Sequence, residues 1–490
     1  FTNGFPDATL DVSATPAAEP ARMSLRYAIS PGNRQMVREV LISGLRTTDP
    51  ELVKQRIILE AGDPLSLTSL VEGQRRLYDL GIFARVDAAL QNSEGETDHK
   101  YVLYRFEEAR KISITGGIGA QIARIGRGSP SFDTPAGTAG FSPRVSFGLS
   151  RSNFLGVGHT ISLQGRLSSI QRRGLLTYLA PQFKGNDELS LTFTGIYDDL
   201  RDVQTFNSRR IEGSIQLAQR LSKANTIQYR ISQRRIRITD LKITPELIPL
   251  FSQPVQLATV STTFIQDRRD DAVDARRGVY NTLDVALAAN FFGDARTTFS
   301  RALGRNATYH RIGREMVFAR ATSFGILQRA SGADVPLPER FFSGGASSHR
   351  GFPDNQTGPR DLLTGFPIGG KALLINNHEL RFPLLGDNVG GVFFHDAGTV
   401  YSDIRSVSLR VRQRNLQDFN YMVHAVGFGV RYRTPIGPVR VDLAYSVNSP
   451  RFMGLQGSFE ELLIPNNPLV KFVDQRINPF QFHFSLGQLF

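Results

Sequence analysis

The residue types that usually carry enzyme chemistry are sparse in this sequence and do not form catalytic motifs. There are eight His and no Cys, so disulfides, thiolate nucleophiles and Cys-based zinc or iron–sulfur sites are excluded. The H-E-x-x-H pattern, the G-x-x-x-x-G-K-[ST] loop and the G-x-S-x-G turn do not occur. The stretch Gly116-Gly117-Ile118-Gly119 is only superficially like a dinucleotide-binding turn, because no helix is predicted after it. We therefore predict no enzyme activity and no cofactor.

Two clusters of charged residues suggest ion or nucleic-acid binding at first sight. The acidic stretch 267–274 could supply carboxylates to calcium, but the Arg residues interleaved in it favour a network within a turn. A net charge of +13 and a pI of 10.1 make nucleic acid the obvious partner of Arg234, Arg235 and Arg237. However, only eight of the 58 cations are Lys, and the Arg residues alternate with apolar ones. This favours a wet barrel interior or a lipopolysaccharide-facing surface, so we predict neither a metal site nor a nucleic-acid partner.

Apolar and polar residues alternate from about Ala109 to Phe490, and a helical period is absent there. Alternation with a period of two predicts β-strands. Charged residues of both signs stand on the polar face of these strands, which is typical of a water-filled lumen opposite a lipid-facing surface. The charged residues that carry this argument are Arg166, Arg230, Asp284, Arg431, Arg440 and Asp442.

The connections between these strands differ in length, as they do in outer-membrane barrels. Residues 434–438 predict a tight turn, and residues 328–374 predict a long, Gly-rich loop. At about 24 residues for each strand and its connection, residues 110–490 predict an all-β transmembrane barrel of about 16 antiparallel strands. A transmembrane helix is excluded because no run of 18 apolar residues occurs. The mean hydropathy of −0.20 is compatible with a half-polar barrel.

Residues 33–109 predict a separate α+β domain with the order β-α-α-β-β. Asp49 and Pro50 are typical of a helix start. Ser66 or Thr68 can cap a second helix, which carries its apolar residues on one face. Strand-like stretches stand before the first helix and after the second one.

Residues 1–32 resemble the closing part of another such domain. The Gly4-Phe5-Pro6 turn corresponds to Gly81-Ile82-Phe83, and two strand-like stretches follow it. The first strand and first helix of that unit are missing, and the chain begins with Phe1 rather than Met. We therefore expect that the natural chain extends further at its N-terminus and that the domain is repeated.

Several short motifs follow one another along the chain. They are Leu77-Tyr78-Asp79-Leu80-Gly81-Ile82-Phe83, Asn153-Phe154-Leu155-Gly156-Val157-Gly158, Gly344-Gly345 followed by His349-Arg350-Gly351-Phe352, Phe394-His395-Asp396-Ala397-Gly398, Pro435-Ile436-Gly437-Pro438 before Arg440-Val441-Asp442, and the terminal Phe490. In this order they resemble the BamA/TamA superfamily of outer-membrane assembly and translocation proteins. The resemblance implies a periplasmic POTRA domain at 33–109, the remnant of a preceding one at 1–32, and a transmembrane barrel at 110–490 with a long extracellular loop at about 328–374.

In this superfamily an Arg-Gly-Phe loop folds back into the barrel, and its Arg pairs with the Asp of a Phe-x-Asp-x-Gly strand. The resemblance therefore implies that the loop segment Arg350-Gly351-Phe352 meets Asp396, in the strand that also carries Gly398. A cation in a lumen needs a partner, and Arg and a carboxylate can form two parallel hydrogen bonds. His349 stands where the superfamily usually has Val. The pair could pin the loop only, or it could act directly in the assembly cycle.

The first and last strands of the barrel form the second candidate site. Three Gly fall in the first strand, and glycine weakens a strand because it has no side chain to pack. They could serve close packing or a bend, or they could make the seam easy to open. The resemblance implies a lateral gate between strands near 111–122 and 480–490, where an open edge can template an incoming strand. The seam residues are then Gly116, Gly117, Gly119, Phe484 and Phe490.

The resemblance implies a protein that folds and inserts β-barrel proteins into the bacterial outer membrane through this seam. The implied partners are client outer-membrane proteins, accessory lipoproteins of an assembly complex, the lipid bilayer and lipopolysaccharide. The alternative is a polypeptide-translocating pore of the two-partner secretion type, which two POTRA units and a plug helix in the full-length gene would favour. A passive porin is a further alternative, which a lumen blocked by residues 328–374 disfavours.

Overall fold

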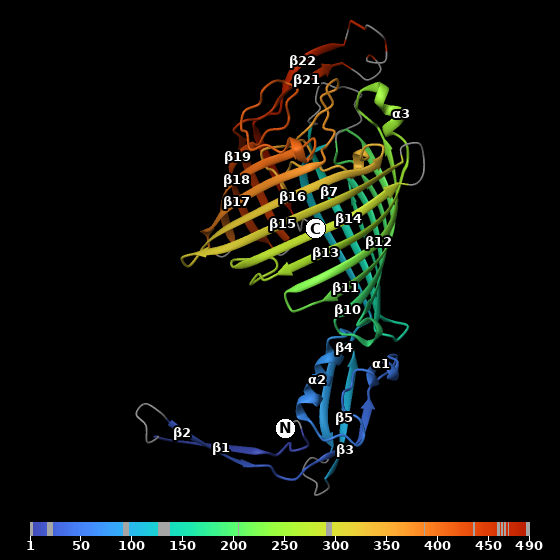
Figure 1. Cartoon of the computed structure of the whole chain (residues 1–490), viewed down its shortest axis with the longest axis vertical. Coiled ribbons are helices and arrows are strands. Elements are labelled where there is room, and N and C mark those ends of the chain that lie inside the picture. The colour runs from blue at the N-terminus through green and yellow to red at the C-terminus, as the bar shows by residue number, and fades with distance from the viewer. Residues whose placement is uncertain are drawn as a thin grey trace. The chain divides into compact units, whose positions relative to one another are not determined.

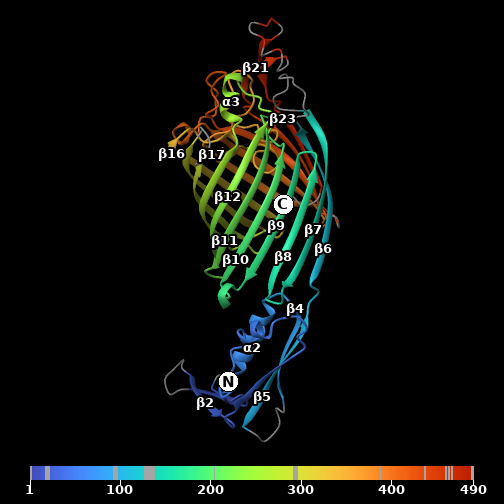
Figure 2. The same ribbon diagram turned by 90° about the vertical axis from the view of Figure 1, so that its right-hand side faces the viewer.

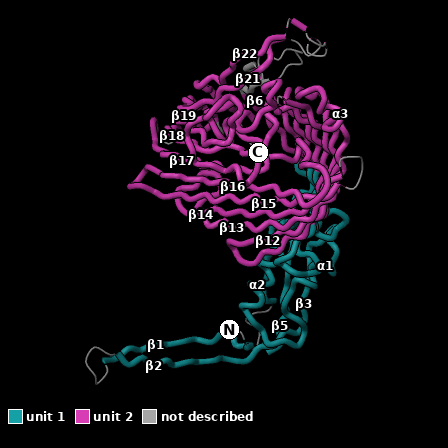
Figure 3. Tube along the Cα trace, turned by 45° about the horizontal axis from the view of Figure 1, so that its top comes forward, with its two compact units in different colours: residues 1–113, 149–162, 178–191 teal, residues 114–148, 163–177, 192–490 magenta. Residues whose placement is uncertain are grey.

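The computed structural model contains the helices and strands drawn in Figures 1 and 2, and the chain divides into the two compact units coloured in Figure 3. One unit comprises Phe1–Ser113 with the stretches Leu149–Ser162 and Tyr178–Leu191, and the other comprises the remaining residues. The structure describes residues 3–16, 23–91, 98–125, 138–203, 205–290, 296–386, 388–434, 437–457, 461, 464, 467–468, 470 and 471–486.

A three-stranded sheet and two helices form an α+β domain in the first unit. Its elements are β3 (Met36–Ser43), α1 (Pro50–Lys54), α2 (Leu67–Tyr78), β4 (Phe83–Gln91) and β5 (His99–Glu108). The strand order in the sheet is β3-β5-β4, with β3 parallel to β5 and β4 antiparallel to it. The elements therefore follow one another as β-α-α-β-β along the chain.

The sequence explains why the two helices begin where they do. The Asp49 side chain accepts a backbone N–H at the start of α1, which satisfies one of the free donors of a helix N-terminus. Of the two candidate caps for α2, Ser66 takes this role, and Thr68 lies within the helix. One apolar face of α2 packs on the sheet, where Leu77 and Tyr104 are fully buried.

One carboxylate ties the end of β5 to the segment before α1. Glu108 Oε1 accepts the backbone N–H groups of Arg46, Thr47 and Thr48 at 2.8–3.0 Å, and both Thr hydroxyls donate to the same carboxylate at 2.7 Å. Burial acts to raise the pKa of Glu108, but the hydrogen bonds outweigh it and hold the pKa well below its usual range. The charged form of Glu108 is therefore part of the fold of this domain.

The substitution Glu108→Gln should lower the stability of this domain at neutral pH by about 2 kcal/mol. The amide that replaces the carboxylate is neutral and has only one acceptor oxygen, so the charge-assisted hydrogen bonds are lost. Since the folded-state pKa is lowered, the stabilisation is present above the ordinary pKa of a Glu. It is lost as the pH falls through the lower folded-state value. Hydrogen exchange of the β5 amides in the full chain should differ between wild type and variant at pH 7 and converge in acid. A difference that stays constant with pH would contradict this role of the charge.

Residues near the N-terminus form a two-stranded antiparallel sheet of β1 (Thr9–Pro16) and β2 (Met23–Ser30). One face of this hairpin is apolar, and its large side chains are more than half exposed. An isolated hairpin is marginally stable in water, so this face is one that a further element would normally cover. Its exposed apolar residues are Leu10, Val12, Met23, Leu25, Tyr27 and Ile29.

Sixteen antiparallel strands close into a barrel, which confirms the predicted architecture (Figure 1). The last strand, β23, lies between β20 and β6, so the barrel is closed by its own first and last strands. The strands are β6 (Ile112–Ile125), β7 (Thr138–Phe154), β8 (His159–Ser168), β9 (Gln171–Pro181), β10 (Leu189–Leu200), β11 (Asn207–Arg220), β12 (Asn225–Thr239), β13 (Val255–Asp267), β14 (Gly278–Asn290), β15 (Thr297–Ile312), β16 (Met316–Gly332), β17 (Ala372–Leu385), β18 (Val389–Tyr401), β19 (Val423–Thr434), β20 (Gly437–Ser446) and β23 (Phe480–Leu486).

The two ends of the barrel differ, because long connections alternate with short turns. The longest described connection joins β16 to β17 and runs over 333–371, which is shorter at both ends than the predicted 328–374 because the two strands extend into that range. At the same end lie 240–254 with α3 (Ile248–Phe251), 402–422, and 447–479 with β21 (Arg451–Gln456) and β22 (Lys471–Arg476). We call this the long-loop end. None of the helices among the described residues is long and apolar enough to cross a membrane.

The polar residues inside the barrel are mostly cationic. A cavity of about 2080 Å³ is lined by eight Arg and three acidic side chains, together with parts of β6, β7 and β17 to β20. Arg166, Arg431 and Arg440 belong to this lining, whereas Asp442 is buried and paired with Arg431 at 2.6 Å. The alternation in the sequence thus separates a charged interior from an apolar exterior.

The acidic stretch 267–274 forms a turn held by its own hydrogen bonds. Asp270 Oδ1 accepts the backbone N–H groups of Arg276 and Arg277, and Asp271 Oδ1 accepts those of Val273 and Asp274. Within the described part of the chain, no group of three or more His, Asp or Glu side chains is arranged to hold a metal ion.

Candidate functional site

The 333–371 connection brings Arg350 against Asp396 of β18. Arg350 Nε and Nη2 donate to the two carboxylate oxygens of Asp396 at 2.8 and 2.6 Å, and the backbone N–H of Arg350 donates to the same carboxylate at 2.9 Å. Both side chains are almost fully buried. A planar guanidinium with two parallel bonds to one carboxylate fixes the position of the loop as well as its charge.

Three further side chains complete the surroundings of this pair. Glu379 of β17 accepts Arg350 Nη1 at 2.7 Å, so a second carboxylate shares the guanidinium. Asn377, which lies on β17 like Glu379, donates to Asp396 Oδ1 at 2.8 Å. The Arg350 guanidinium carbon lies 3.6 Å from the ring centre of Phe394, close enough for a cation–π interaction. The guanidinium is therefore held on several sides by β17 and β18.

The glycines and the Phe of the two motifs have steric roles here. A side chain at Gly351 would collide with Ala425 of β19, and one at Gly398 would collide with the backbone of β17. Gly398 also has φ of +133°, which side-chain-bearing residues rarely adopt. Phe352 is fully buried in an apolar cluster of loop and strand residues, so the loop is packed into the barrel as well as hydrogen-bonded to it.

His349, the departure from the superfamily pattern, is also fully buried. Its Nε2 lies 3.1 Å from the carbonyl oxygen of Val423, and its ring packs edge-on against Phe352. An apolar residue at this position could make only the packing contact. His349 therefore adds a hydrogen bond between the loop and β19.

The tip of the loop also contacts the last strand of the barrel. The imidazole of His483 in β23 lies with Nε2 2.8 Å from the carbonyl oxygen of Arg350, so Nε2–H donates to it. Arg350 is thus bonded through its side chain to β18 and through its backbone to β23. This contact links the Arg350–Asp396 pair to β23, the strand that closes the barrel.

The substitution His483→Ala should loosen β23, because a hydrogen bond of about 1 kcal/mol is removed. We expect the amides of residues 480–486 to exchange about fivefold faster, in line with that energy, while the amides of β15 and β16 keep their rates. His483→Gln, whose amide can donate to the same carbonyl, should restore most of the protection. Equal exchange in all three proteins would exclude His483 as a tie between loop and strand.

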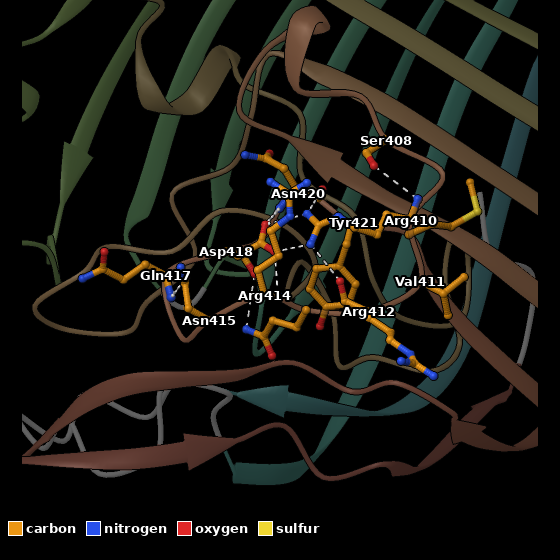
Figure 4. A network of polar contacts seen from close by, with 12 residues as sticks. Ser408, Arg410, Val411, Arg412, Arg414, Asn415, Gln417, Asp418, Asn420 and Tyr421 are labelled. Atoms are coloured by element: carbon orange, nitrogen blue, oxygen red, sulfur yellow. Dashed lines mark hydrogen bonds and ion pairs between the residues drawn. The ribbon is translucent and has the colours of Figure 1, made fainter.

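Polar contacts order the neighbouring 402–422 connection, which has almost no regular structure (Figure 4). Arg410 forms two parallel hydrogen bonds with Asp418, at 2.6 and 3.0 Å, and also donates to the carbonyl of Asn420. Tyr421 from this connection packs with Phe352 in the same buried cluster. The two long connections are therefore packed on each other.

The barrel is closed by pairing between β23 and β6. Among the described residues, β23 pairs with β6 at Phe484–Ile122, Ser485–Gln121 and Leu486–Ala120. On its other side, β23 pairs with β20 over seven residues. The last strand of the barrel is thus held between β20 and the first strand, β6.

One predicted seam residue, Phe484, lies in the described pairing, and the predicted glycines lie next to it along β6. Gly116, Gly117 and Gly119 precede the paired part of β6, and a side chain at Gly117 would crowd the Ser146 hydroxyl of β7. Phe484 pairs with Ile122, and Phe490 lies outside the described residues. The glycines therefore lie in β6 directly before the described pairs with β23.

A closed barrel of sixteen strands, entered by a loop whose Arg is bound to β18, agrees with a family model: the Omp85 superfamily domain matches residues 153–490. The chain belongs to the Omp85 superfamily. The outer membrane protein assembly factor BamA of Nitratidesulfovibrio vulgaris is 22% identical over 459 residues, which cover 91% of this chain and 53% of that protein. This Omp85 chain spans about half the length of the curated relatives it matches.

Two solved structures share the fold of this Omp85 chain. BamA from Haemophilus ducreyi lacking POTRA domains 1–3 superposes with a TM-score of 0.74 at 18% identity, over 98% of this chain and 90% of that one. CdiB from Acinetobacter baumannii superposes with a TM-score of 0.52 at 12% identity, over 99% and 78%. At such identities the likeness concerns the fold alone.

The sequence pointed to Arg350 and Asp396 but missed their neighbours Glu379, Asn377 and His483. One signal for the first two was available: Asn377 and Glu379 are polar, two residues apart and therefore on one face of a strand. Their position opposite Asp396 depends on the β17–β18 register, in which Asn377 pairs with Asp396. His483 could not be assigned, because its partner is a backbone oxygen distant in sequence.

Proposed function

We propose that this Omp85 chain spans the bacterial outer membrane and folds and inserts β-barrel proteins there, through the seam between β6 and β23. The observation that carries the proposal is the position of β23, the last strand, which pairs with β6, the first strand, so that the two ends of the barrel sequence meet in one seam. Opening this one contact would free two strand edges at once. A free edge templates an incoming strand by adding it to the sheet.

The relatives named outer membrane protein assembly factor support the same function. The proposal needs no cofactor and no covalent step, because a closed, fully hydrogen-bonded client barrel is favoured in lipid once its edges are paired. The partners that we propose are client outer-membrane proteins, accessory lipoproteins of an assembly complex, the bilayer and lipopolysaccharide.

In this proposal the α+β domain at 33–109 is a POTRA domain that faces the periplasm. Residues 1–32 are the closing strands of a preceding one, and 110–490 is the barrel, with the 333–371 connection on the extracellular side. The uncovered apolar face of β1 and β2 supports the second assignment, because the rest of such a domain would bury it. The β-α-α-β-β order supports the first.

The second candidate function is translocation of an extended polypeptide through the lumen. The cavity of about 2080 Å³ inside the barrel favours it, whereas the packing of Phe352 and Tyr421 in the long connections opposes free passage. Depletion of the protein followed by a census of outer-membrane proteins separates the two functions. Broad loss of barrel proteins supports assembly, and loss of one secreted protein with normal barrels supports translocation.

A further inference from the structure

Strands β10, β11 and β12 are neighbours in the barrel wall (Figure 2). Four Arg residues stand at their long-loop end. Arg209 is the third residue of β11 and pairs in register with Arg237 of β12, and Arg235 pairs with Ile211. Arg201 follows the end of β10. We call Arg201, Arg209, Arg235 and Arg237 the rim cluster.

The rim cluster carries more positive charge than its surroundings neutralise. Asp199 is the carboxylate found near it, 3.6 Å from Arg209 and 3.9 Å from Arg201. Within the described ranges, the guanidinium groups of Arg235 and Arg237 have no hydrogen-bond or ion-pair partner. Like charges directly opposite each other on paired strands are destabilising, so an arrangement with Arg209 opposite Arg237 calls for a counter-charge.

The strand faces that carry the rim cluster are apolar farther from the long loops. Ile211, Ile215 and Ile231 are each about half exposed or more, and Ile215 pairs with Ile231. The side chains of Arg235 and Arg237 are exposed on the same face of β12 as Ile231, since they are four and six residues away from it. The face therefore changes from apolar to cationic along the strand.

We infer that the rim cluster binds the phosphate of an anionic lipid headgroup, with the lipid chains lying along the apolar face below it. The fork of a guanidinium matches the oxygens of a phosphate, and a cation near the membrane surface gains free energy from anionic lipid. The inference rests on the proposed membrane-spanning barrel. A soluble acidic protein could neutralise the Arg side chains, but it would leave the apolar strand face beside them exposed to water.

Lipid binding to the full chain in neutral detergent tests the inference. Native mass spectrometry would follow titration with phosphatidylglycerol and, separately, with phosphatidylcholine, whose phosphate is balanced by its own cation. The double variant Arg235→Gln/Arg237→Gln should weaken phosphatidylglycerol binding by roughly tenfold or more, as expected from the loss of two surface charges. Phosphatidylcholine binding should be unchanged. Heat-modifiable gel migration would show that the variant barrel is folded.

The matched control is Arg412→Gln/Arg414→Gln, which removes two exposed charges from the 402–422 connection at the same end. It should change phosphatidylglycerol binding by less than about twofold, because it lies off the apolar strand face. Equal losses in control and double variant, or full binding by the double variant, would overturn the inference. So would displacement of the lipid by an equal concentration of inorganic phosphate. Client assembly is measured separately, so either proposal can fail alone.

Discussion

The substitution Arg350→Ala should leave the barrel closed but release the 333–371 connection and reduce client assembly severalfold. The guanidinium is shared by Asp396 and Glu379, and its removal leaves two carboxylates in the barrel without that cation. Breaking a buried pair in this way costs about 3–5 kcal/mol. Its hydrogen bonds to β17 and β18 also hold the loop against the strands. Loss of the pair should therefore act on the loop first.

Limited proteolysis in the 333–371 connection and complementation of a depletion strain measure these two effects. Arg350→Lys keeps the charge but not the two parallel bonds to Asp396, so it should be intermediate. Arg381→Ala is the matched control, because Arg381 pairs with Glu379 at 2.9 Å but contacts neither Arg350 nor Asp396. It should leave the loop protected. A protected loop and normal assembly in Arg350→Ala would refute both roles of the pair, whereas a released loop with normal assembly would mean that it only pins the loop.

A disulfide across the seam should stop client assembly, and reduction should restore it. Gln121 and Ser485 are register partners on β6 and β23, so the pair Gln121→Cys/Ser485→Cys has neighbouring Cα atoms within disulfide range. The chain has no Cys of its own, so no other disulfide competes. If clients are templated on the free edges of these strands, a covalent link removes the step that frees them.

The control disulfide joins β20 to the other side of β23. Ala444 and Gln481 are register partners there and are both buried. The pair Ala444→Cys/Gln481→Cys should form a disulfide without loss of assembly. Assembly at the normal rate with the β6–β23 disulfide fully formed would rule out the lateral seam, and equal loss in both proteins would point to damage by the bonds themselves.

Local patterns predicted the elements of this molecule well, because they depend on residues near in sequence. Alternation over strands such as β14 and β19 predicted a β-barrel, the length of the region predicted about sixteen strands, and the structure confirms both. The ends of the long connection were harder to predict from the sequence. Gln328 and Leu374 were assigned to the connection, but in the structure they continue the ladders of β16 and β17. Pairing with a neighbouring strand, and not local composition, decides where a strand ends.

The candidate site depends on register, which a single sequence does not define. The motifs identified Arg350 and Asp396, yet the contact of His483 with the Arg350 backbone requires β23 to lie beside β20 at one particular offset. The seam shows the same dependence, because the pairing of Gln121 with Ser485 follows from the offset between β6 and β23 and from no local pattern.

The position of β23 has a consequence for the biogenesis of this barrel itself. Most of its strand pairs join neighbours in sequence and can form hairpin by hairpin, with small loop-closure entropy. The β6–β23 contact joins the two ends of the barrel sequence, so it cannot form until the last residues have been delivered. Closure therefore carries the largest loop-closure entropy of any strand pairing in the barrel. The folding of this protein should end with its slowest step, and a half-closed barrel should be the intermediate that accumulates.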